Sequence, residues 1–427
     1  MLQKGDKRVI RAWTFYDWAN SVYPLVMSSA VFPIYYESQT SIKENGITVF
    51  DQVTVLGHTF KNTEFYAYVV SLSYVTVALI APLLSGIADY TGNKKRFLQF
   101  FCFLGAISSS LLYFFDPKNL GLTMLPLFFA SVGYWGSLVY YNAYLPEIAE
   151  PADHDRISAK GFAMGYLGSA LLLIIVLVLA QFLKIMPFNM AFPLVGVWWI
   201  GFAMITFARL PNNVYGHKPQ GNFLAKGYQE LGKVWKDIRS RKQLRRFLAS
   251  YFMYNMAVQT VMIMATPFAN KEVQGIKTQD LIVSILLIQF VGIGGSFLFS
   301  KLSSLYGNLR AAGIAIFFWI LICTGVFFFV HVPWQFYIAA ACVGLVMGGI
   351  QALSRSTYSK MLPETEDHAS YFSFFDVSEK IGLAIGTFSF GLIEGLADIR
   401  TSVLALTAFF IIGFLLLLRV PKSEMVR

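Results

Sequence analysis

Trp13–Pro24 reads W-T-F-Y-D-W-A-N-S-V-Y-P and opens the first long apolar segment of the chain. Asp17, Asn20 and Ser21 fall at helical positions i, i+3 and i+4, so they share one face, and apolar side chains occupy the other. An acidic side chain in a membrane-spanning helix is costly unless it faces water or a polar partner. The remaining helices must therefore supply polar neighbours along this face.

Composition places the chain in the membrane. Of its 427 residues 56% are hydrophobic and 14% are charged, against about 25% charged in soluble domains. Apolar runs long enough to cross a bilayer recur from end to end, and the short alternating segments of a membrane β-barrel are absent from the sequence. The sequence therefore predicts an all-α, multi-pass membrane protein. The net charge of +10 follows from basic loops, so no nucleic-acid partner is expected.

The apolar segments number twelve, which puts both ends of the chain on one side. Most of the 34 Lys and Arg residues lie before the first segment, after the last, or in the even-numbered loops. By the positive-inside rule both termini are predicted to be cytoplasmic. The segments are 12–37, 64–88, 97–115, 121–145, 157–183, 188–208, 246–269, 279–301, 311–331, 333–354, 370–393 and 400–419.

Short motifs recur in the same order, offset by 214 to 217 positions, which indicates a duplicated six-helix unit. We therefore divide the chain into a six-helix bundle over 1–209, a linker over 210–245 and a second bundle over 246–427. Within the linker, the basic amphipathic stretch Phe223–Arg246 predicts a helix on the inner leaflet. The motif pairs are Gly92-Asn93 with Gly307-Asn308, Leu145-Pro-Glu147 with Leu362-Pro-Glu364, and Asp153-His154 with Asp367-His368.

The first outer loop, 38–63, contains two β-rich stretches around Asp51-Gln52. Ile47–Phe50 and Val53–Leu56 are predicted to pair as one short hairpin.

Charged residues are concentrated in particular segments. Segments three, six, nine and twelve have no ionisable side chain in their interiors, and we expect them on the outside. Asp17 lies in segment one, Asp376, Glu379 and Lys380 lie in segment eleven, and Arg355 lies at the inner end of segment ten. Because charge in hydrocarbon is costly, this segregation predicts a central aqueous pathway.

Each of these charges admits two interpretations. If the first span begins near Trp13, Asp17 lies only about 6 Å along it, so it is either a gate or cap near the interface or a proton site. Asp376 and Lys380 are spaced i, i+4 for an ion pair, which leaves Glu379 as the freer titratable group. Arg355 either binds a substrate carboxylate or anchors the inner face.

Uncharged polar residues recur at helical spacing in segments four, seven and ten. They either line the cavity or form hydrogen bonds between helices. The three cysteines, unpaired in spacing, are predicted to be small buried residues. No nucleophile–base pair, Walker loop or metal-ligand cluster appears in the sequence, so we expect neither an enzyme nor a cofactor. The polar candidates are Tyr141, Asn142, Asn255, Gln259 and Gln351.

The stretch Ser85–Arg96, S-G-I-A-D-Y-T-G-N-K-K-R, resembles the signature loop of the major facilitator superfamily. The resemblance implies a twelve-helix fold of two six-helix halves in a pseudo-twofold parallel repeat. It also implies that the acid at the helix end binds the N-terminal end of span eleven and latches the halves together. The predicted latch residues are Gly86, Asp89, Gly92, Lys94, Lys95 and Arg96.

Three further motifs, Phe15–Ser21, Gly165–Gly168 and Phe375–Lys380, resemble the vacuole-effluxer (autophagy-related) branch of that superfamily and its bacterial members. The resemblance implies a transporter of small solutes, with amino acids suggested for the fungal vacuolar members.

We therefore expect a monomeric secondary transporter in a bacterial cytoplasmic membrane that moves a small, amino-acid- or peptide-like solute by alternating access. Proton coupling through Asp17 or Glu379 is expected. The alternatives are an uncoupled facilitator or exporter, a lipid flippase, and a non-transporting scaffold on the same fold.

Overall fold

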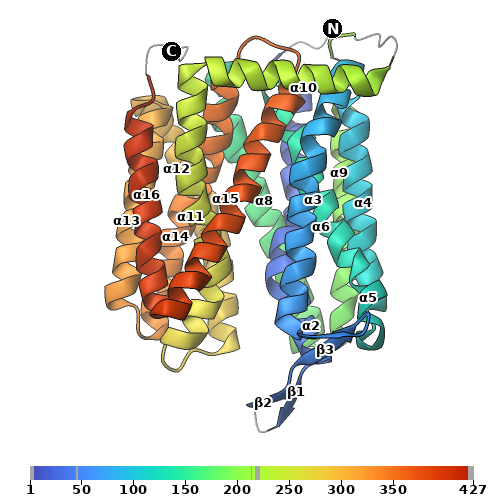
Figure 1. The fold of residues 1–427 in the computed structure, drawn as a ribbon, viewed down its shortest axis with the longest axis vertical. Helices are drawn as coiled ribbons and strands as arrows, with labels where there is room; N and C mark the ends of the chain where they lie inside the picture. Colours follow the sequence, from blue (N-terminus) through green and yellow to red (C-terminus); the bar gives the residue numbers. More distant parts are fainter. Residues whose placement is uncertain (1–3, 45–46, 213, 217–221, 422–427) are drawn as a thin grey trace.

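The computed structural model describes residues 4–44, 47–212, 214–216 and 222–421. The described chain crosses between two faces twelve times, in two groups of six helical passes that stand side by side (Figure 1). The first group contains α1 (Lys7–Asn20), α2 (Phe32–Thr40), α3 (Asn62–Thr91), α4 (Lys94–Leu111), α5 (Leu120–Thr123), α6 (Leu125–Ala143), α7 (Leu145–Ile148), α8 (His154–Leu177) and α9 (Ala191–Arg209). The second contains α11 (Lys242–Glu272), α12 (Thr278–Tyr306), α13 (Asn308–Phe329), α14 (Pro333–Met361), α15 (His368–Leu396) and α16 (Ile399–Leu418).

The two ends of the bundle differ. On one face α1 begins, α16 ends, and the linker helix α10 (Phe223–Ser240) lies across the ends of the other helices (Figure 1). We call this the terminal face. The opposite face carries four short strands, and we call it the strand face. The division of the chain at 209/210 and 245/246 stays a prediction. In the structure α10 ends at Ser240 and α11 begins at Lys242.

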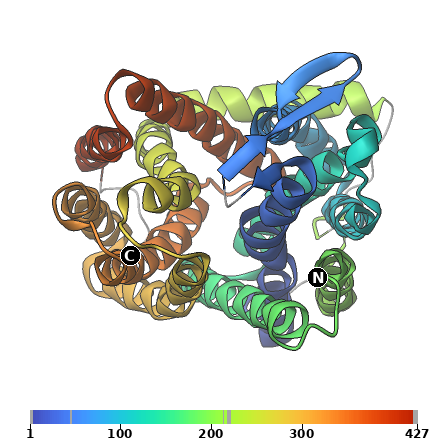
Figure 2. The ribbon, with the colours of Figure 1, turned by 90° about the horizontal axis from the view of Figure 1, so that it is seen from below.

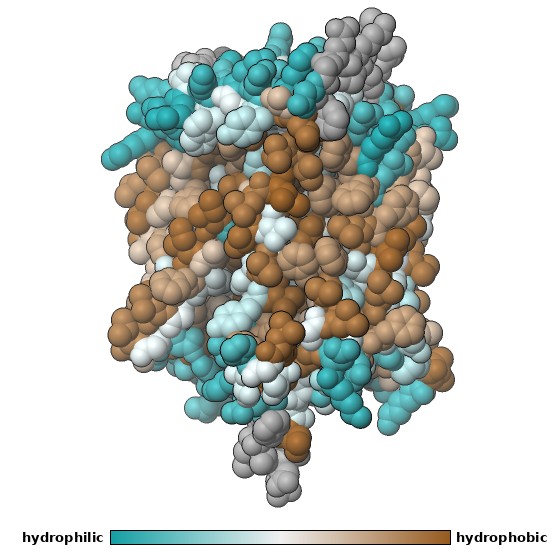
Figure 3. All heavy atoms as spheres, turned by 45° about the vertical axis from the view of Figure 1, so that its right-hand side comes forward, coloured by the Kyte–Doolittle hydropathy of each residue, from teal (hydrophilic) through white to brown (hydrophobic). Residues whose placement is uncertain are grey.

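On the face shown in Figure 3, apolar side chains cover the middle of the bundle and hydrophilic side chains lie at both ends. Among the described residues nine helices are long and apolar enough to span a membrane, or ten if the bent pair Pro117–Thr123 and Leu125–Ile148 forms one span. The two remaining passes are α1–α2 and α15. The first of these is divided into α1, a π-helical stretch and α2, each too short to span a membrane by itself, and α15 carries Asp376, Glu379 and Lys380.

The first pass is not one regular helix. Between α1 and α2 the chain forms a wider, π-helical stretch, Tyr23–Val31, in which the hydroxyl of Ser29 donates to the carbonyl of Pro24 over 2.7 Å. Proline has no N–H to donate to the preceding turn, so Pro24 and Pro33 both weaken regular α-helix here.

The helices α4, α9, α13 and α16 pack chiefly on helices of their own half and form the outside of the bundle (Figure 2). They are the third, sixth, ninth and twelfth passes, as predicted. The halves meet through α3 with α15, α8 with α12 and α14, and α6 with α15. Of the charges that the sequence places inside spans, Arg355 lies on α14 and Asp376, Glu379 and Lys380 lie on α15, both of which are helices of this interface.

Two local predictions are wrong. The outer loop forms two hairpins, β1 (Ile42–Glu44) with β2 (Ile47–Phe50) and β3 (Gln52–Val55) with β4 (His58–Lys61). The predicted pairing of β2 with β3 does not form, because the two-residue turn is at Leu56-Gly57, where both residues have positive φ and match the strand twist.

The cysteines are not all buried. Cys102 and Cys323 are buried, whereas Cys342 is exposed. An apolar segment in a membrane exposes one face to lipid, so apolar sequence alone does not establish burial inside the protein.

Candidate functional site: the charged interface between the halves

The end of α3 is tied to the start of α15 by Asp89. Its two carboxylate oxygens accept hydrogen bonds from the backbone N–H groups of Ala369, over 3.2 Å, and Ser370, over 2.7 Å. A helix N-terminus has unpaired N–H groups and a positive dipole end, so it stabilises a buried anion. Lys94 lies 3.2 Å from the same carboxylate and also pairs with Glu147. The contact implied by the signature-loop resemblance is therefore present.

The other predicted latch residues do not join one cluster. Gly92 ends α3 with φ of 69°, a conformation that glycine adopts without strain. The Lys95 ammonium donates to the carbonyl of Leu210 over 2.9 Å, and Arg96 is exposed. Gly86 lies against the linker helix, where a Cβ would come 2.2 Å from the carbonyl oxygen of Gly227.

Glu147 extends the latch across the halves, and it was not among the residues predicted for the latch. Its carboxylate lies 3.2 Å from Nδ1 of His368, the first residue of α15, and it is buried. The repeated motifs Leu-Pro-Glu and Asp-His contain both residues, so the repeat was the available signal. The neighbouring Asp367, outside the spans, has its pKa raised to about 6 by burial and by the charges of Asp89 and Glu230.

A second tie relates to the first by the internal repeat. Asp155, at the start of α8, accepts hydrogen bonds from Ser303 at 2.7 Å, Asn308 at 2.6 Å and the Lys360 ammonium at 2.6 Å. It joins the first half to α12, α13 and α14. Gly307 ends α12 with positive φ, as Gly92 ends α3. Thus α8 and α15, which begin at repeat-related histidines, are each held to the opposite half at their first turn.

Deeper in the bundle Asp17 pairs with Arg355 of the opposite half. Both guanidinium nitrogens Nη1 and Nη2 lie 3.2 Å from Oδ2 of Asp17, and the hydroxyl of Tyr141 donates to the same oxygen over 2.7 Å. Arg355 also donates to the hydroxyl and carbonyl of Ser158. Only 4% and 7% of the two charged side chains are exposed. The pair is therefore a buried, hydrogen-bonded tie between α1 and α14.

Three aromatic rings and a glycine surround the Asp17–Arg355 pair. The guanidinium carbon of Arg355 lies 4.8, 5.5 and 4.2 Å from the ring centres of Trp13, Tyr141 and Phe162, a cation–π arrangement. Gly161 makes room, because a Cβ there would come 2.2 Å from Oδ2 of Asp17. Neither interpretation offered for Arg355 anticipated this partner.

The helix that carries Asp17 begins before Trp13, but its first turns hold Lys7, Arg8 and Arg11, so the depth of Asp17 in the membrane stays a prediction. The helix α1 begins at Lys7, so Asp17 is ten residues, or about 15 Å, along it.

The remaining polar candidates lie around the pair or deeper. Arg355 Nη1 lies 3.4 Å from the amide oxygen of Asn142, and Gln351 accepts from the hydroxyl of Tyr166 over 2.6 Å across the halves. The side-chain nitrogens of Asn20 and Asn255 are buried and have no hydrogen-bond partner among the described residues. Unpaired buried donors are costly, so these two amides have unused capacity for a polar ligand or water.

A second charged group lies within the second half. Lys380 pairs with Asp376, the predicted i, i+4 ion pair, and its ammonium lies 3.7 Å from the ring centre of Trp135 in α6. Glu379 accepts from the hydroxyl of Tyr251 over 3.1 Å and from the amide of Gln259 over 2.8 Å. Both donors are neutral. Glu379 thus differs from Asp17 in having no described cationic partner within ion-pair distance.

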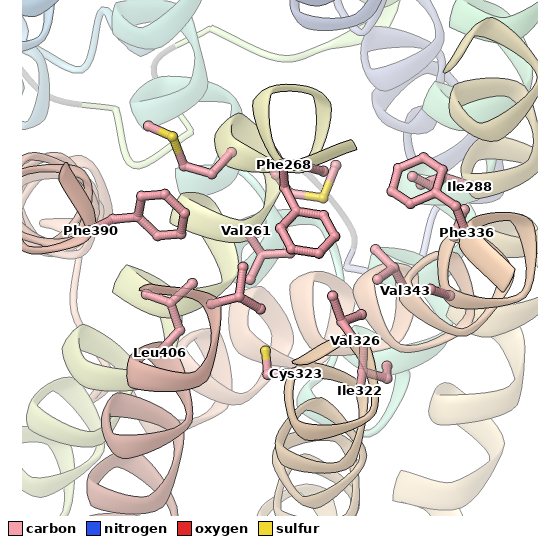
Figure 4. A pocket seen from close by; sticks show the side chains of 16 residues that line it. Val261, Phe268, Ile288, Ile322, Cys323, Val326, Phe336, Val343, Phe390 and Leu406 are labelled. Atoms are coloured by element: carbon pink, nitrogen blue, oxygen red, sulfur yellow. The ribbon is translucent and has the colours of Figure 1, made fainter. Parts of the chain in front are cut away.

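An apolar cavity of about 60 Å³ lies elsewhere in the second half, among α11, α13, α14 and α16 (Figure 4). Its wall is formed by apolar side chains, among them Val261, Phe268 and Leu406, together with Cys323, and no charged side chain lines it. It therefore offers nothing to orient a polar solute, and the candidate site is the interface between the halves.

Comparison with known proteins agrees with this geometry. The sequence model of the family described as "Vacuole effluxer Atg22 like" matches residues 5–426. The chain belongs to this family. It is a major facilitator transporter, not an enzyme.

Curated relatives of the effluxer family match along most of the chain. One is the "Uncharacterized MFS-type transporter YxiO" of Bacillus subtilis, 30% identical over 423 residues, 96% of this chain and 94% of the relative. Another is "Autophagy-related protein 22-1" of Penicillium rubens, 22% identical over 543 residues, 98% of this chain and 91% of the relative.

Solved structures show the fold of this effluxer-family member. The human organic anion transporter MFSD10 has a TM-score of 0.75 at 12% identity, covering 97% of this chain and 100% of that one. The E. coli fucose:proton symporter FucP has a TM-score of 0.67 at 15% identity, covering 97% and 98%. The predicted major facilitator fold, twelve helices in two halves, is confirmed.

Proposed function

We propose that this effluxer-family protein is a secondary active transporter that moves a small solute by alternating access and couples it to protons. The observation that carries the proposal is the contrast at the interface between a carboxylate held by a cation, Asp17, and a carboxylate held by neutral donors, Glu379. The terminal face, rich in Lys and Arg, is placed in the cytoplasm, and the working unit is a monomer.

Alternating access is supported by the position of the ties between the halves. In the part of the chain that the structure describes, the hydrogen bonds that join helices of the two halves lie between the terminal face and the level of Tyr166 and Gln351. Opening the terminal face requires the Asp89, Asp155 and Asp17 contacts to break together. Rocking of one half against the other around a central site does this.

Glu379 is assigned the proton. A carboxylate that is hydrogen-bonded by Tyr251 and Gln259 can lose its charge without leaving a buried cation unpaired. Protonation of Asp17 would leave the Arg355 guanidinium buried without its counter-ion, which costs several kcal/mol. Glu379 is also partly exposed, whereas Asp17 is buried, so a proton reaches Glu379 more easily in this conformation.

The solute is assigned to the space beside Glu379 and Lys380. Glu379 and Lys380 supply both signs of charge there, and the unpaired amide of Asn255 lies on α11 between Tyr251 and Gln259, the two residues that hold Glu379. Such a site suits a solute that carries an amine, a carboxylate or an amide, such as an amino acid or a short peptide. Aromatic rings, Trp135 among them, supply apolar contact.

The experiment uses proteoliposomes that enclose a pH-sensitive dye. Amino acids, dipeptides, sugars, nucleosides and amphiphiles are added one at a time, and internal pH is followed. We expect one solute class to move protons with wild-type protein and not with Glu379→Gln, while the same class still raises the melting temperature of the variant. Solute movement without any proton movement would instead indicate an uncoupled facilitator. Stabilisation by lipids alone would favour a flippase or a scaffold.

A further inference from the structure

The linker helix α10 has two apolar stripes, and the protein covers one of them. Gly227, Val234 and Ile238 are buried against the bundle. Leu224, Tyr228 and Trp235 follow one another at helical spacing on the adjoining face, with the half-buried Leu231 between them, and are 53%, 69% and 48% exposed.

Two cations border the exposed stripe. Lys236 and Arg239 lie on its outer side, and in the part of the chain that the structure describes neither forms an ion pair. The charges of Lys233 and Arg241, by contrast, are paired with Glu230 and Asp237. Aromatic and aliphatic side chains beside unpaired cations, on a helix parallel to the membrane plane, match the headgroup region of a bilayer with acidic lipid.

The same helix contacts both halves at the terminal face. Its Gly227 packs on Gly86 of α3, where backbone meets backbone with no side chain between. On the other side, Asp237 accepts a hydrogen bond of 2.5 Å from the hydroxyl of Tyr371 in α15, and Trp235 lies 5.4 Å from Phe374 between ring centres. Thus α10 bridges the two helices, α3 and α15, that the Asp89 latch also joins.

From these observations we infer that α10 is a binding site for acidic phospholipid, and that lipid bound there holds the terminal face closed. A ligand shifts a conformational equilibrium only if it binds one state better. When α3 and α15 separate, α10 cannot keep both contacts, and the orientation that turns Trp235 and Lys236 to the headgroups is lost. Acidic lipid therefore favours the state in which the halves are joined.

The test measures the distance between the halves at the terminal face. Spin labels at Arg96 and Arg310, both exposed, are placed on a Cys342→Ala background of the full chain in nanodiscs. With wild-type α10, adding phosphatidylglycerol to phosphatidylcholine is expected to raise the ratio of short to long distances, by at most about fivefold per cation. The double variant Lys236→Gln/Arg239→Gln is expected to lose this response.

The matched control is Lys7→Gln/Arg11→Gln, which removes the same charge from α1 on the same face. It is expected to respond to phosphatidylglycerol as wild type does. The inference is overturned if phosphatidylglycerol does not change the wild-type distances, or if the α10 variant responds as fully as wild type. It is also overturned if the control variant loses the response to the same extent as the α10 variant. Since no transported solute enters the assay, its outcome is independent of the proposed transport activity.

Discussion

Asp17 of α1 and Glu379 of α15 are both carboxylates inside the bundle, yet their partners differ in kind. Asp17 reaches across the interface to a buried arginine, whereas Glu379 stays within its own half and is held by a tyrosine and a glutamine. A carboxylate beside a buried cation is held by an opposite charge, whereas neutral donors supply hydrogen bonds without an opposite charge. The first is suited to tie the halves together and the second to exchange a proton.

The most severe test of the tie is removal of its cation. Arg355→Ala leaves Asp17 buried and unpaired, which is expected to destabilise the closed form by about 3–5 kcal/mol. A large fall in melting temperature is the expected result. The double variant Asp17→Asn/Arg355→Gln should recover much of the loss, because no unpaired charge remains. Equal melting temperatures for wild type and Arg355→Ala would show that the pair contributes no tie.

A substitution that keeps both charges isolates the geometry. In Gly161→Ala the new methyl meets Oδ2 of Asp17 at 2.2 Å, so the pair must move, at a cost of about 1–3 kcal/mol. Gly201→Ala is the matched control, since a Cβ at that helical position has no neighbour within 4 Å. Thermal unfolding of the two variants compares them. A Gly161→Ala protein as stable as Gly201→Ala contradicts the packing described around Asp17.

The latch at the terminal face should contribute less than the buried tie. Asp89→Asn keeps the shape but removes the charge that faces Lys94 and the N-terminus of α15, an effect of about 1–2 kcal/mol. The population with the terminal face open, measured by spin-label distances at Arg96 and Arg310, is expected to rise several-fold. An unchanged distribution would remove Asp89 from the latch.

A further effect is the pH dependence of stability that comes from Asp367, whose pKa is raised from 3.8 to about 6 by burial and by the neighbouring acids. The folded state binds this proton more tightly than the unfolded state. The carboxylate therefore does not lower the free energy of unfolding below pH 4, and it lowers it by the full amount above pH 6. Stability therefore falls as pH rises through this window. Asp367→Asn should be more stable than wild type at neutral pH and equal to it near pH 4, in melting curves across pH. A difference that grows toward low pH would reverse the sign and refute the assignment.

Local patterns in the sequence predicted what depends on local geometry. The twelve passes follow from apolar runs, and the Asp376–Lys380 pair follows from i, i+4 spacing. The Asp89 contact was implied by a family motif, whose partner lies 280 positions away.

Contacts between distant segments had no such signal. Arg355 and Asp17 are 338 positions apart, and no sequence pattern around either residue indicates its partner. Lys380 against Trp135 was missed for the same reason. The predicted pairing of Ile47–Phe50 with Val53–Leu56 was wrong because strand pairing depends on the turn geometry at Leu56-Gly57. The alternation of side chains does not specify that geometry.

The comparison of the two carboxylates is tested most directly by the terminal-face distance as a function of pH in wild type, Glu379→Gln and Asp17→Asn. No solute needs to be known. On an Asp367→Asn background, which removes the other titrating carboxylate at the terminal face, the distribution is predicted to change with pH, Glu379→Gln to be insensitive to pH, and Asp17→Asn to be more open at every pH while keeping the pH response. A pH response that survives in Glu379→Gln and disappears in Asp17→Asn would contradict the assignment and exchange the two roles.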